Sequence, residues 1–174
     1  IIRDPATYEK FAEVVLVHGV RLVAELAYHE YLTQELPQHE ILGEMVRAQL
    51  RYYPTVTRAP YANQGRINDL IESGKLFADL GVPPLDPQVD RAMLCGSPAM
   101  LASLKTILEA RGFKEGSTTT PGDFVGCECA AAGHFLPSSC PIVPLWGGKN
   151  WPRWGTFSLS TPKVRQAPSS LGSI

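Results

Sequence analysis

The sequence lacks the features that mark several large classes of protein. None of its apolar stretches approaches the ~20 residues that a membrane-spanning helix needs, and the first five residues lack the pattern of a signal peptide. Sixteen basic and seventeen acidic residues give a formal net charge of −1, so there is no global positive field to attract nucleic acid or an acidic membrane surface. We therefore expect a soluble, cytoplasmic protein with no nucleic-acid partner and no membrane partner.

The motifs of several common catalytic classes are also missing. The sequence contains no G-x-x-x-x-G-K-[ST], H-E-x-x-H or G-x-S-x-G pattern, which leaves the nucleotide-hydrolase, zinc-protease and serine-hydrolase classes without their residues. Cys127, Cys129, His134 and Cys140 could be considered as zinc ligands. Their C-x-C spacing is shorter than zinc sites usually have, so we expect no metal.

Acidic residues become scarce in the last third of the chain. Sixteen of the seventeen carboxylates lie at or before Asp123, whereas all three tryptophans and three of the four cysteines follow Val125. The stretch 126–174 contains six prolines, six glycines and seven serines, without apolar periodicity long enough to define an element. We therefore expect a folded module over residues 1–125 and a disordered or aberrant, irregular tail over residues 126–174.

Helix-like and strand-like segments alternate along residues 1–125. The patterns predict helices over 4–12, 21–36, 66–73 and 98–109, and strands over 14–17, 51–57, 92–95 and from 123 onward. Pro54 and Pro60 favour an edge position for the second strand. Such alternation is typical of an α/β fold with a doubly wound, mostly parallel sheet, in which ligands sit at the carboxyl ends of the strands.

The first predicted strand is followed by His18, Gly19, Val20 and Arg21. The helix expected next would expose unpaired backbone amides and the positive end of its dipole at this point. These residues would then form a seat for an anion, with a guanidinium beside it. The alternative is that Gly19 only makes a tight turn and Arg21 only faces water.

The second predicted strand ends at Thr57 and leads into a loop with two arginines, Arg58 and Arg66. Two guanidinium groups satisfy a phosphate monoester better than one lysine does. In doubly wound dinucleotide-binding folds, an acid near this strand end binds the ribose of NAD, whereas an arginine accommodates the 2′-phosphate of NADP. The loop contains no acid between Thr57 and Arg66, which favours NADP. The alternative is a pair of solvated loop arginines.

The third predicted strand ends in Cys95, Gly96, Ser97 and Pro98. Gly96 allows a ligand to approach the backbone closely, and Ser97 can cap the following helix while its hydroxyl meets a substrate. A lone cysteine in this position is more often a small buried apolar residue than a nucleophile.

Several short segments of residues 1–125 form one ordered set. They are Val17-His18-Gly19-Val20-Arg21, Tyr52-Tyr53-Pro54-Thr55-Val56-Thr57-Arg58, Gly65-Arg66, Asp69-Leu70-Ile71, Cys95-Gly96-Ser97-Pro98 with Met100-Leu101, and Pro121-Gly122-Asp123-Phe124-Val125. Their order and spacing resemble bacterial ferredoxin (flavodoxin)–NADP reductases. The resemblance implies the C-terminal NADP-binding domain of an oxidoreductase that carries FAD on an N-terminal β-barrel. Such enzymes exchange electrons between NADPH and ferredoxin or flavodoxin through the flavin.

The resemblance also implies roles for individual residues. By it, Arg58 and Arg66 would hold the adenosine 2′-phosphate, and Arg21 would lie along the bound dinucleotide. Cys95, with its Gly96-Ser97-Pro98 turn, would be close to the nicotinamide and is the catalytic candidate. The implied cofactors are NADP(H) on this module and FAD on the barrel.

The sequence departs from the family at both ends. It begins after the family's first strand and glycine-rich loop, so we expect an unfilled slot in the middle of the sheet. It lacks the flavin barrel, so no group in this chain accepts a hydride. After Val125 the sequence also differs from the family's terminus, as a change of reading frame would produce.

Three other functions stay open at this point. One is a non-catalytic module that binds NADP(H), and another is an inactive truncated fragment, for which the missing strand is the main argument. A more distant one is an interaction protein that uses Trp146, Trp151 and Trp154.

Overall fold

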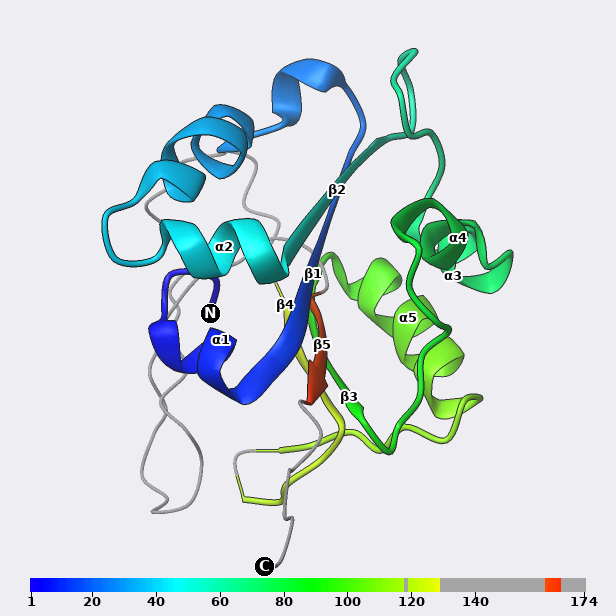
Figure 1. Ribbon diagram of the computed structural model, residues 1–174. Helices are drawn as coiled ribbons and strands as arrows, with labels where there is room; N and C mark the ends of the chain where they lie inside the picture. Colours follow the sequence, from blue (N-terminus) through cyan, green and yellow to red (C-terminus); the bar gives the residue numbers. More distant parts are fainter. Residues whose placement is uncertain (118, 129–161, 167–174) are drawn as a thin grey trace, which may run out of the picture.

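A computed structural model describes residues 1–117, 119–128 and 162–166 (Figure 1). The helices are α1 (Pro5–Lys10), α2 (Gly43–Gln49), α3 (Ile67–Glu72), α4 (Lys75–Leu80) and α5 (Pro98–Glu109), with short 3-10 or π turns at Val23–Glu25, Tyr31–Glu35 and Leu36–Gln38. The strands are β1 (Phe11–Val20), β2 (Leu50–Val56), β3 (Asp90–Gly96), β4 (Phe124–Glu128) and β5 (Pro162–Gln166).

The five described strands form one sheet in the order β2-β1-β5-β3-β4. β1 is parallel to β2, and β3 is parallel to β4, whereas β5 runs antiparallel to both β1 and β3. The carboxyl ends of β1, β2, β3 and β4 therefore lie along one edge, which we call the carboxyl edge. β2 lies at the border of the sheet, as its prolines predicted.

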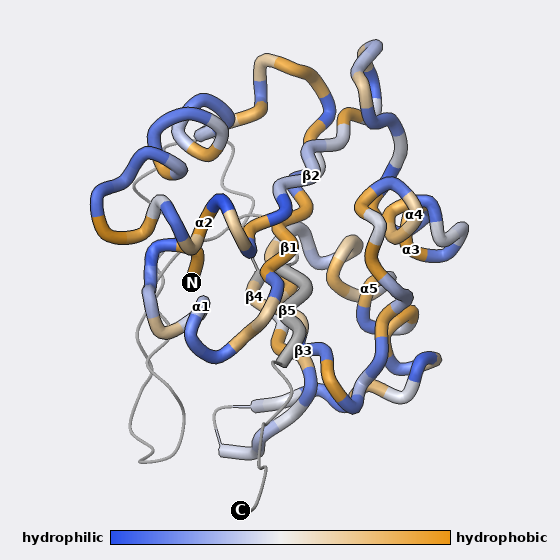
Figure 2. Tube along the Cα trace, in the orientation of Figure 1, coloured by the Kyte–Doolittle hydropathy of each residue, from blue (hydrophilic) through white to orange (hydrophobic). Residues whose placement is uncertain are grey.

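Helices cover both faces of this sheet (Figure 1). On one face, α1, α2 and the turns between residues 31 and 38 close over a core that includes Phe11, Val14 and Leu16. On the other face, α3, α4 and α5 close over a larger core that includes Val15, Val17 and Leu94. In Figure 2 the apolar residues of β1 lie in the middle of the molecule, between the two groups of helices. The predicted α/β class with a doubly wound, mostly parallel sheet is confirmed.

β1 extends further than the predicted strand 14–17. Val14 to Val17 are all buried, because alternate side chains enter the two opposite cores. Before them, α1 begins at the N-cap residue Asp4, whose carboxylate accepts a hydrogen bond from the N–H of Ala6 at 3.1 Å. This helix ends at Lys10 rather than at residue 12, so that Phe11 already belongs to the strand.

The slot that we expected to be unfilled contains β5. Residues 162–166 pair with β1 on one side and with β3 on the other. The expectation of an irregular tail is therefore wrong for these five residues, and β4 itself runs on to Glu128. β5 is opposite only the first part of β1, up to Leu16, and the first part of β3, up to Ala92.

The helix predicted over 21–36 is also wrong. Tyr28 adopts a left-handed conformation with φ of 60°, which a continuous right-handed helix does not allow. The segment forms separate short turns instead. Elsewhere, the sequence did not predict α2 or α4, and Gly74, with φ of 76°, separates α4 from α3.

Within the described ranges, no helix has both the length and the apolar character needed to cross a bilayer.

Gly19, near the end of β1, sets how closely α3 packs. A Cβ atom added at this position would lie 2.9 Å from Cδ1 and 3.0 Å from Cγ1 of Ile67. We expect Gly19→Ala to lower the free energy of unfolding by about 1–3 kcal/mol, because a buried side chain of α3 must move. Urea denaturation of the single variants and of Gly19→Ala/Ile67→Val measures this. The double variant should lose less free energy of unfolding than the two single variants lose together, since Ile67→Val removes Cδ1. Strictly additive losses would contradict the close contact between Gly19 and Ile67.

Candidate functional site

The carboxyl edge collects almost every residue that the sequence predicted for a ligand site. His18, Gly19 and Val20 end β1, and Arg21 follows them. Thr57 and Arg58 follow β2. Cys95 and Gly96 end β3, and Ser97 and Pro98 begin α5. Because the three strands that carry these residues run in the same direction, the segments share one edge of the sheet.

The pairing of β1 with β2 continues past the ends of both strands. The N–H of Thr57 donates to the carbonyl oxygen of Val20 at 3.0 Å, and the N–H of Arg58 donates to the carbonyl oxygen of Arg21 at 2.8 Å. Arg21 and Arg58 are thus held next to each other by the backbone. Both side chains are exposed. Two guanidinium groups therefore belong to one fixed framework rather than to independent loops.

Backbone amides at this edge are not left for an external anion. The N–H groups of Arg21 and Leu22 donate to one carboxylate oxygen of Glu25, at 2.9 Å and 3.1 Å. Hydrogen bonds from Leu22 and then Arg21 lower the pKa of Glu25, and the nearby charges of Arg21 and Arg58 act in the same direction. The predicted seat of helix amides is therefore wrong, because the expected helix is absent and Glu25 fills the position of the anion.

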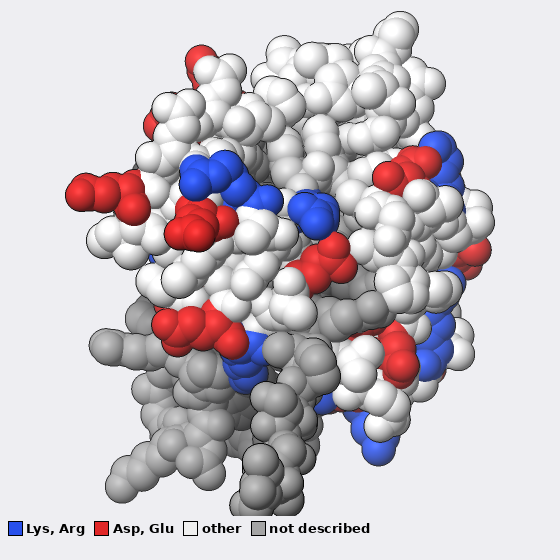
Figure 3. All heavy atoms as spheres, viewed as in Figure 1, with Lys and Arg blue, Asp and Glu red and all other residues white. Residues whose placement is uncertain are grey.

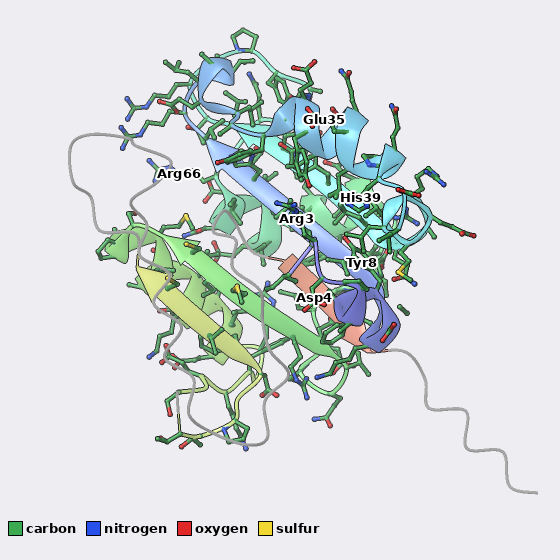
Figure 4. The ribbon with its side chains drawn as sticks, turned by 90° about the vertical axis from the view of Figure 1, so that its left-hand side faces the viewer. Arg3, Asp4, Tyr8, Glu35, His39 and Arg66 are labelled. Atoms are coloured by element: carbon green, nitrogen blue, oxygen red, sulfur yellow. The ribbon has the colours of Figure 1, made fainter. Side chains whose placement is uncertain are left out.

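The loop after β2 folds back against the strand that it leaves. The N–H of Val56 donates to the carbonyl oxygen of Asn63 at 3.1 Å, and the N–H of Gly65 donates to the carbonyl oxygen of Val56 at 3.3 Å. Gly65 has φ of 130°, which only glycine adopts without strain. This fold brings Arg66 back to the carboxyl edge as the residue before α3. Its side chain is exposed and does not cap that helix, and Figure 4 shows it apart from Arg3 and from Tyr8 of α1.

The three arginines at this edge keep their guanidinium groups available. Salt bridges within 4.0 Å in the described part of the chain do not include Arg21, Arg58 or Arg66. Other exposed charges are used differently: Lys75 pairs with Asp79 at 2.7 Å, and acidic and basic side chains intermingle on the face in Figure 3. Exposed, unpaired guanidinium groups on a fixed backbone fit the phosphate groups of a dinucleotide.

The end of β3 is more closed than the ends of β1 and β2. Cys95 is buried, and Ser97 uses its hydroxyl oxygen to accept a hydrogen bond from the N–H of Met100 at 3.4 Å, which caps α5. A Cβ atom added at Gly96 would lie 2.4 Å from the terminal methyl of Met100. The backbone of β3 and the side chain of Met100 are thus in close contact at this point. Pro98 occupies the first turn of α5, where the missing N–H costs no helical bond.

His18 points into the protein rather than toward the edge. Its side chain is buried, and its Nδ1 lies 3.1 Å from the hydroxyl of Tyr52. Burial, and then the neighbouring His29, lower the pKa of His18, while burial raises the pKa of Tyr52 to about 12. Any contact between residue 18 and a ligand at the carboxyl edge is therefore left to its backbone.

Sequence reasoning missed Glu25, Tyr52 and His29 as neighbours of the site. Glu25 had a local signal, because an acid three residues after an N-cap position often accepts hydrogen bonds from the backbone there, and Glu25 is three residues after Leu22. The contacts of Tyr52 with His18 and with His29, at ring centroid distances of 6.2 Å and 5.7 Å, join distant segments and had none. Of the residues considered for zinc, Cys127 is exposed on β4; Cys129, His134 and Cys140, like the three tryptophans, lie outside the described residues.

The sequence is similar to several bacterial reductases. It is 52% identical over 126 residues to the ferredoxin–NADP reductase of Pseudomonas aeruginosa, covering 72% of this chain and 49% of that protein. It is 54% identical over 134 residues to ferredoxin–NADP reductase A of Sorangium cellulosum, covering 77% and 48%. The flavodoxin/ferredoxin–NADP reductase of Escherichia coli is 36% identical over 95 residues. The chain thus spans about half the length of the first two of these proteins.

The fold is similar to that of a solved reductase. A ferredoxin NADP+ reductase from Neisseria gonorrhoeae, crystallised with bound FAD and NADP, superposes with a TM-score of 0.60 at 25% identity. The match covers 73% of this chain and 48% of that one. No family model matches the sequence. The resemblance to bacterial ferredoxin (flavodoxin)–NADP reductases that the sequence motifs indicated is confirmed.

The buried His18 makes stability depend on pH in a predictable direction. Since its pKa is lower in the folded than in the unfolded protein, the unfolded chain binds more protons below pH ~6.5, and the folded state loses stability as the pH falls through that value. We expect the urea midpoint to fall between pH 7.5 and pH 5, and to fall less in His18→Gln, which does not titrate. If the variant and the parent show the same pH dependence, His18 is not the group whose protonation destabilises the folded protein.

Proposed function

We propose that residues 1–125 form the NADP(H)-binding part of a flavin-dependent oxidoreductase that moves electrons between NADPH and ferredoxin or flavodoxin through FAD. The names of the similar bacterial proteins support this assignment, as does the structural neighbour crystallised with FAD and NADP. We further propose that residues 126–174 are a separate Pro/Gly/Ser/Trp-rich tail, apart from the strand residues that join the sheet. A cytoplasmic location stays a prediction.

One observation carries the proposal: the backbone hydrogen bond that fixes Arg58 beside Arg21 at the carboxyl edge. In this proposal Arg58 and Arg66 bind the 2′-phosphate of NADP(H), and Arg21 lies along the dinucleotide. The backbone of Gly19, Val20 and Thr57 would lie along the same side of the dinucleotide as Arg21. Because the negative charges of NADP(H) lie at the phosphates, guanidinium groups supply affinity and choice of cofactor rather than rate.

The end of β3 would receive the nicotinamide. There the absence of a side chain at Gly96 makes room for Met100, so the ring would approach the backbone of Gly96 beside or after movement of that side chain. Ser97 and Pro98 hold the first turn of α5 in place. Cys95 is the proposed catalytic residue, and its burial means that it would act by positioning the ring rather than as a nucleophile. When bound, the flavin supplies the chemistry that accepts a hydride and releases single electrons.

One observation favours the alternative of a non-catalytic NADP(H)-binding module or an inactive fragment. The centre of the sheet is occupied by β5, which runs against the direction of its neighbours. A sheet completed in this way can present the same arginines without any electron-transfer partner. Binding of the adenosine part of NADP(H) is common to the first alternative and to the main proposal, so it is the property to measure first.

We expect the purified chain to bind 2′,5′-ADP and to bind 5′-AMP at least about ten-fold more weakly, because only the former offers a 2′-phosphate to the arginines. Isothermal titration calorimetry of both ligands measures this. The interaction should weaken as salt is raised, since it involves exposed charges. Equal affinity for the two ligands, or no binding by a chain with a helical circular dichroism spectrum, would contradict the assignment of the arginines.

We expect Arg58→Ala to weaken binding of 2′,5′-ADP about ten-fold or more and to leave binding of 5′-AMP nearly unchanged. Lys114→Ala is the matched control, because it removes one exposed positive charge near the amino end of β4, at the opposite edge of the sheet. Lys114→Ala should change the affinity for each ligand only slightly, as the loss of a distant charge does. Equal losses in the two variants would mean that net charge, and not a site, attracts the ligand.

A further inference from the structure

Two cysteines lie side by side near the carboxyl ends of β3 and β4. The two strands are parallel, and their register places Cys95 of β3 directly opposite Cys127 of β4. Both side chains are thiols in this structure. Adjacent strands of a sheet are ~4.7–4.9 Å apart, and the two Cα atoms of a disulfide are usually ~4.4–6.8 Å apart. The backbone therefore holds the two cysteines at a spacing that a disulfide can bridge.

The two thiols belong to the same face of the sheet. Paired residues of neighbouring strands point to one side, and successive residues along a strand alternate between the sides. Leu94 of β3 and Phe124 of β4 belong to the core that α3, α4 and α5 cover. Cys95 follows Leu94, and Cys127 comes three residues after Phe124. Both cysteines therefore point to the opposite face, where no strand or helix separates them.

The two thiols differ in their access to solvent. Cys95 is only 8% exposed, whereas Cys127 is exposed and belongs to β4, which lies at the border of the described sheet. The reaction of a thiol with a dissolved disulfide requires access to that thiol. Such an oxidant therefore meets Cys127 first, and its effect reaches Cys95 through that neighbour.

We propose that Cys95 and Cys127 form a redox-active dithiol, which small disulfide molecules such as oxidised glutathione convert reversibly into a disulfide between β3 and β4. The thiolate of Cys127 attacks one sulfur of the small molecule, which breaks its S–S bond, releases one reduced thiol and leaves a mixed disulfide on Cys127. The thiolate of Cys95 then attacks the sulfur of Cys127 and releases the second reduced thiol. The two cysteines thus lose two electrons and two protons, and the two released thiols take up both.

The position of β4 at the border of the described sheet favours a reversible bond. The Cβ atoms of a disulfide lie ~3.8 Å apart, closer than adjacent strands do, so closing the bond draws β4 toward β3. Disulfides that are strained and accessible are the ones that dissolved thiols reduce readily. This inference concerns the two thiols alone and does not depend on the proposed binding of NADP(H).

Mass spectrometry of the full chain, treated with oxidised glutathione and digested with trypsin without reduction, tests the proposal. Trypsin releases Cys95 in the peptide 92–105 and Cys127 in the peptide 115–149. We expect the two peptides to be linked, and dithiothreitol to separate them. A linkage within the peptide 115–149 in place of this one, or a glutathione that stays on Cys127, would overturn the proposal.

Single substitutions separate the two steps, in a reference chain that carries Cys129→Ser and Cys140→Ser. In Cys95→Ser, glutathione should accumulate on Cys127 to at least about ten times its level in the reference, because the thiol that would displace it is gone. In Cys127→Ser, Cys95 should react at least about ten-fold more slowly, because it is buried. If Cys95 reacts equally fast with and without Cys127, the proposal is wrong. This second measurement stands even where Cys95→Ser fails to fold.

A matched variant of the reference chain tests the register. Val125 points to the same face of β4 as Cys127, but it lies opposite Met93. Val125→Cys/Cys127→Ser therefore keeps two thiols on one face and moves one of them by ~6.6 Å along the strand, which puts the Cα atoms beyond the ~7 Å that a disulfide spans. We expect the linked peptides to fall at least about ten-fold in this variant. An equal yield would mean that the thiols meet without the paired strands, and would overturn the proposal.

Discussion

The arrangement of the whole molecule depends on the backbone hydrogen bonds of one short strand. The parallel strands form two pairs, β1 with β2 and β3 with β4, and β5 lies between the pairs. The arginines at the carboxyl edge follow one pair, whereas Cys95 and the start of α5 follow the other. A dinucleotide that reached from Arg58 to Gly96 would span both pairs. Its two ends would be held in register by β5 and by the core that Val15 and Val17 of β1 share with Leu94 of β3.

In the proposed site, electrostatic recognition at the carboxyl edge would fall on side chains rather than on the backbone. Glu25 already takes the N–H groups that a phosphate would otherwise find at the end of β1. What remains for a ligand is a set of exposed guanidinium groups on a fixed framework. Such groups read the number and position of phosphates, because they are charged forks with defined geometry. They also stay in water, so their attraction is weakened by salt far more than that of a buried amide cradle.

Local patterns in the sequence predicted the parts of the fold that local forces decide. The apolar run Val14 to Val17, which is buried on both faces, predicted β1. Ser97 and Pro98 predicted the start of α5. The prediction of a helix over 21–36 was wrong. It rested on the spacing of apolar residues, which does not reveal that Tyr28 adopts a left-handed conformation.

The features that the sequence did not predict arise from pairing between distant residues. The contact of His18 with Tyr52 depends on the register of two strands. β5 carries no apolar run, and its place in the middle of the sheet depends on backbone pairing with β1 and β3, which are distant in the sequence. The structure does bring the predicted strand ends together at one edge, since parallel strands place their carboxyl ends side by side whatever the loops do; their role as a binding site stays a prediction.

The late position of β5 in the chain has a consequence for biosynthesis. Every other strand that the structure describes has been made by Glu128, whereas β5 begins at Pro162. At ~5–20 residues per second, the roughly 30 residues in between take about 1.5 to 6 s to translate. During that interval the facing edges of β1 and β3 await their central strand. Open strand edges can pair with other chains, so the nascent protein exposes two such edges until β5 has been made.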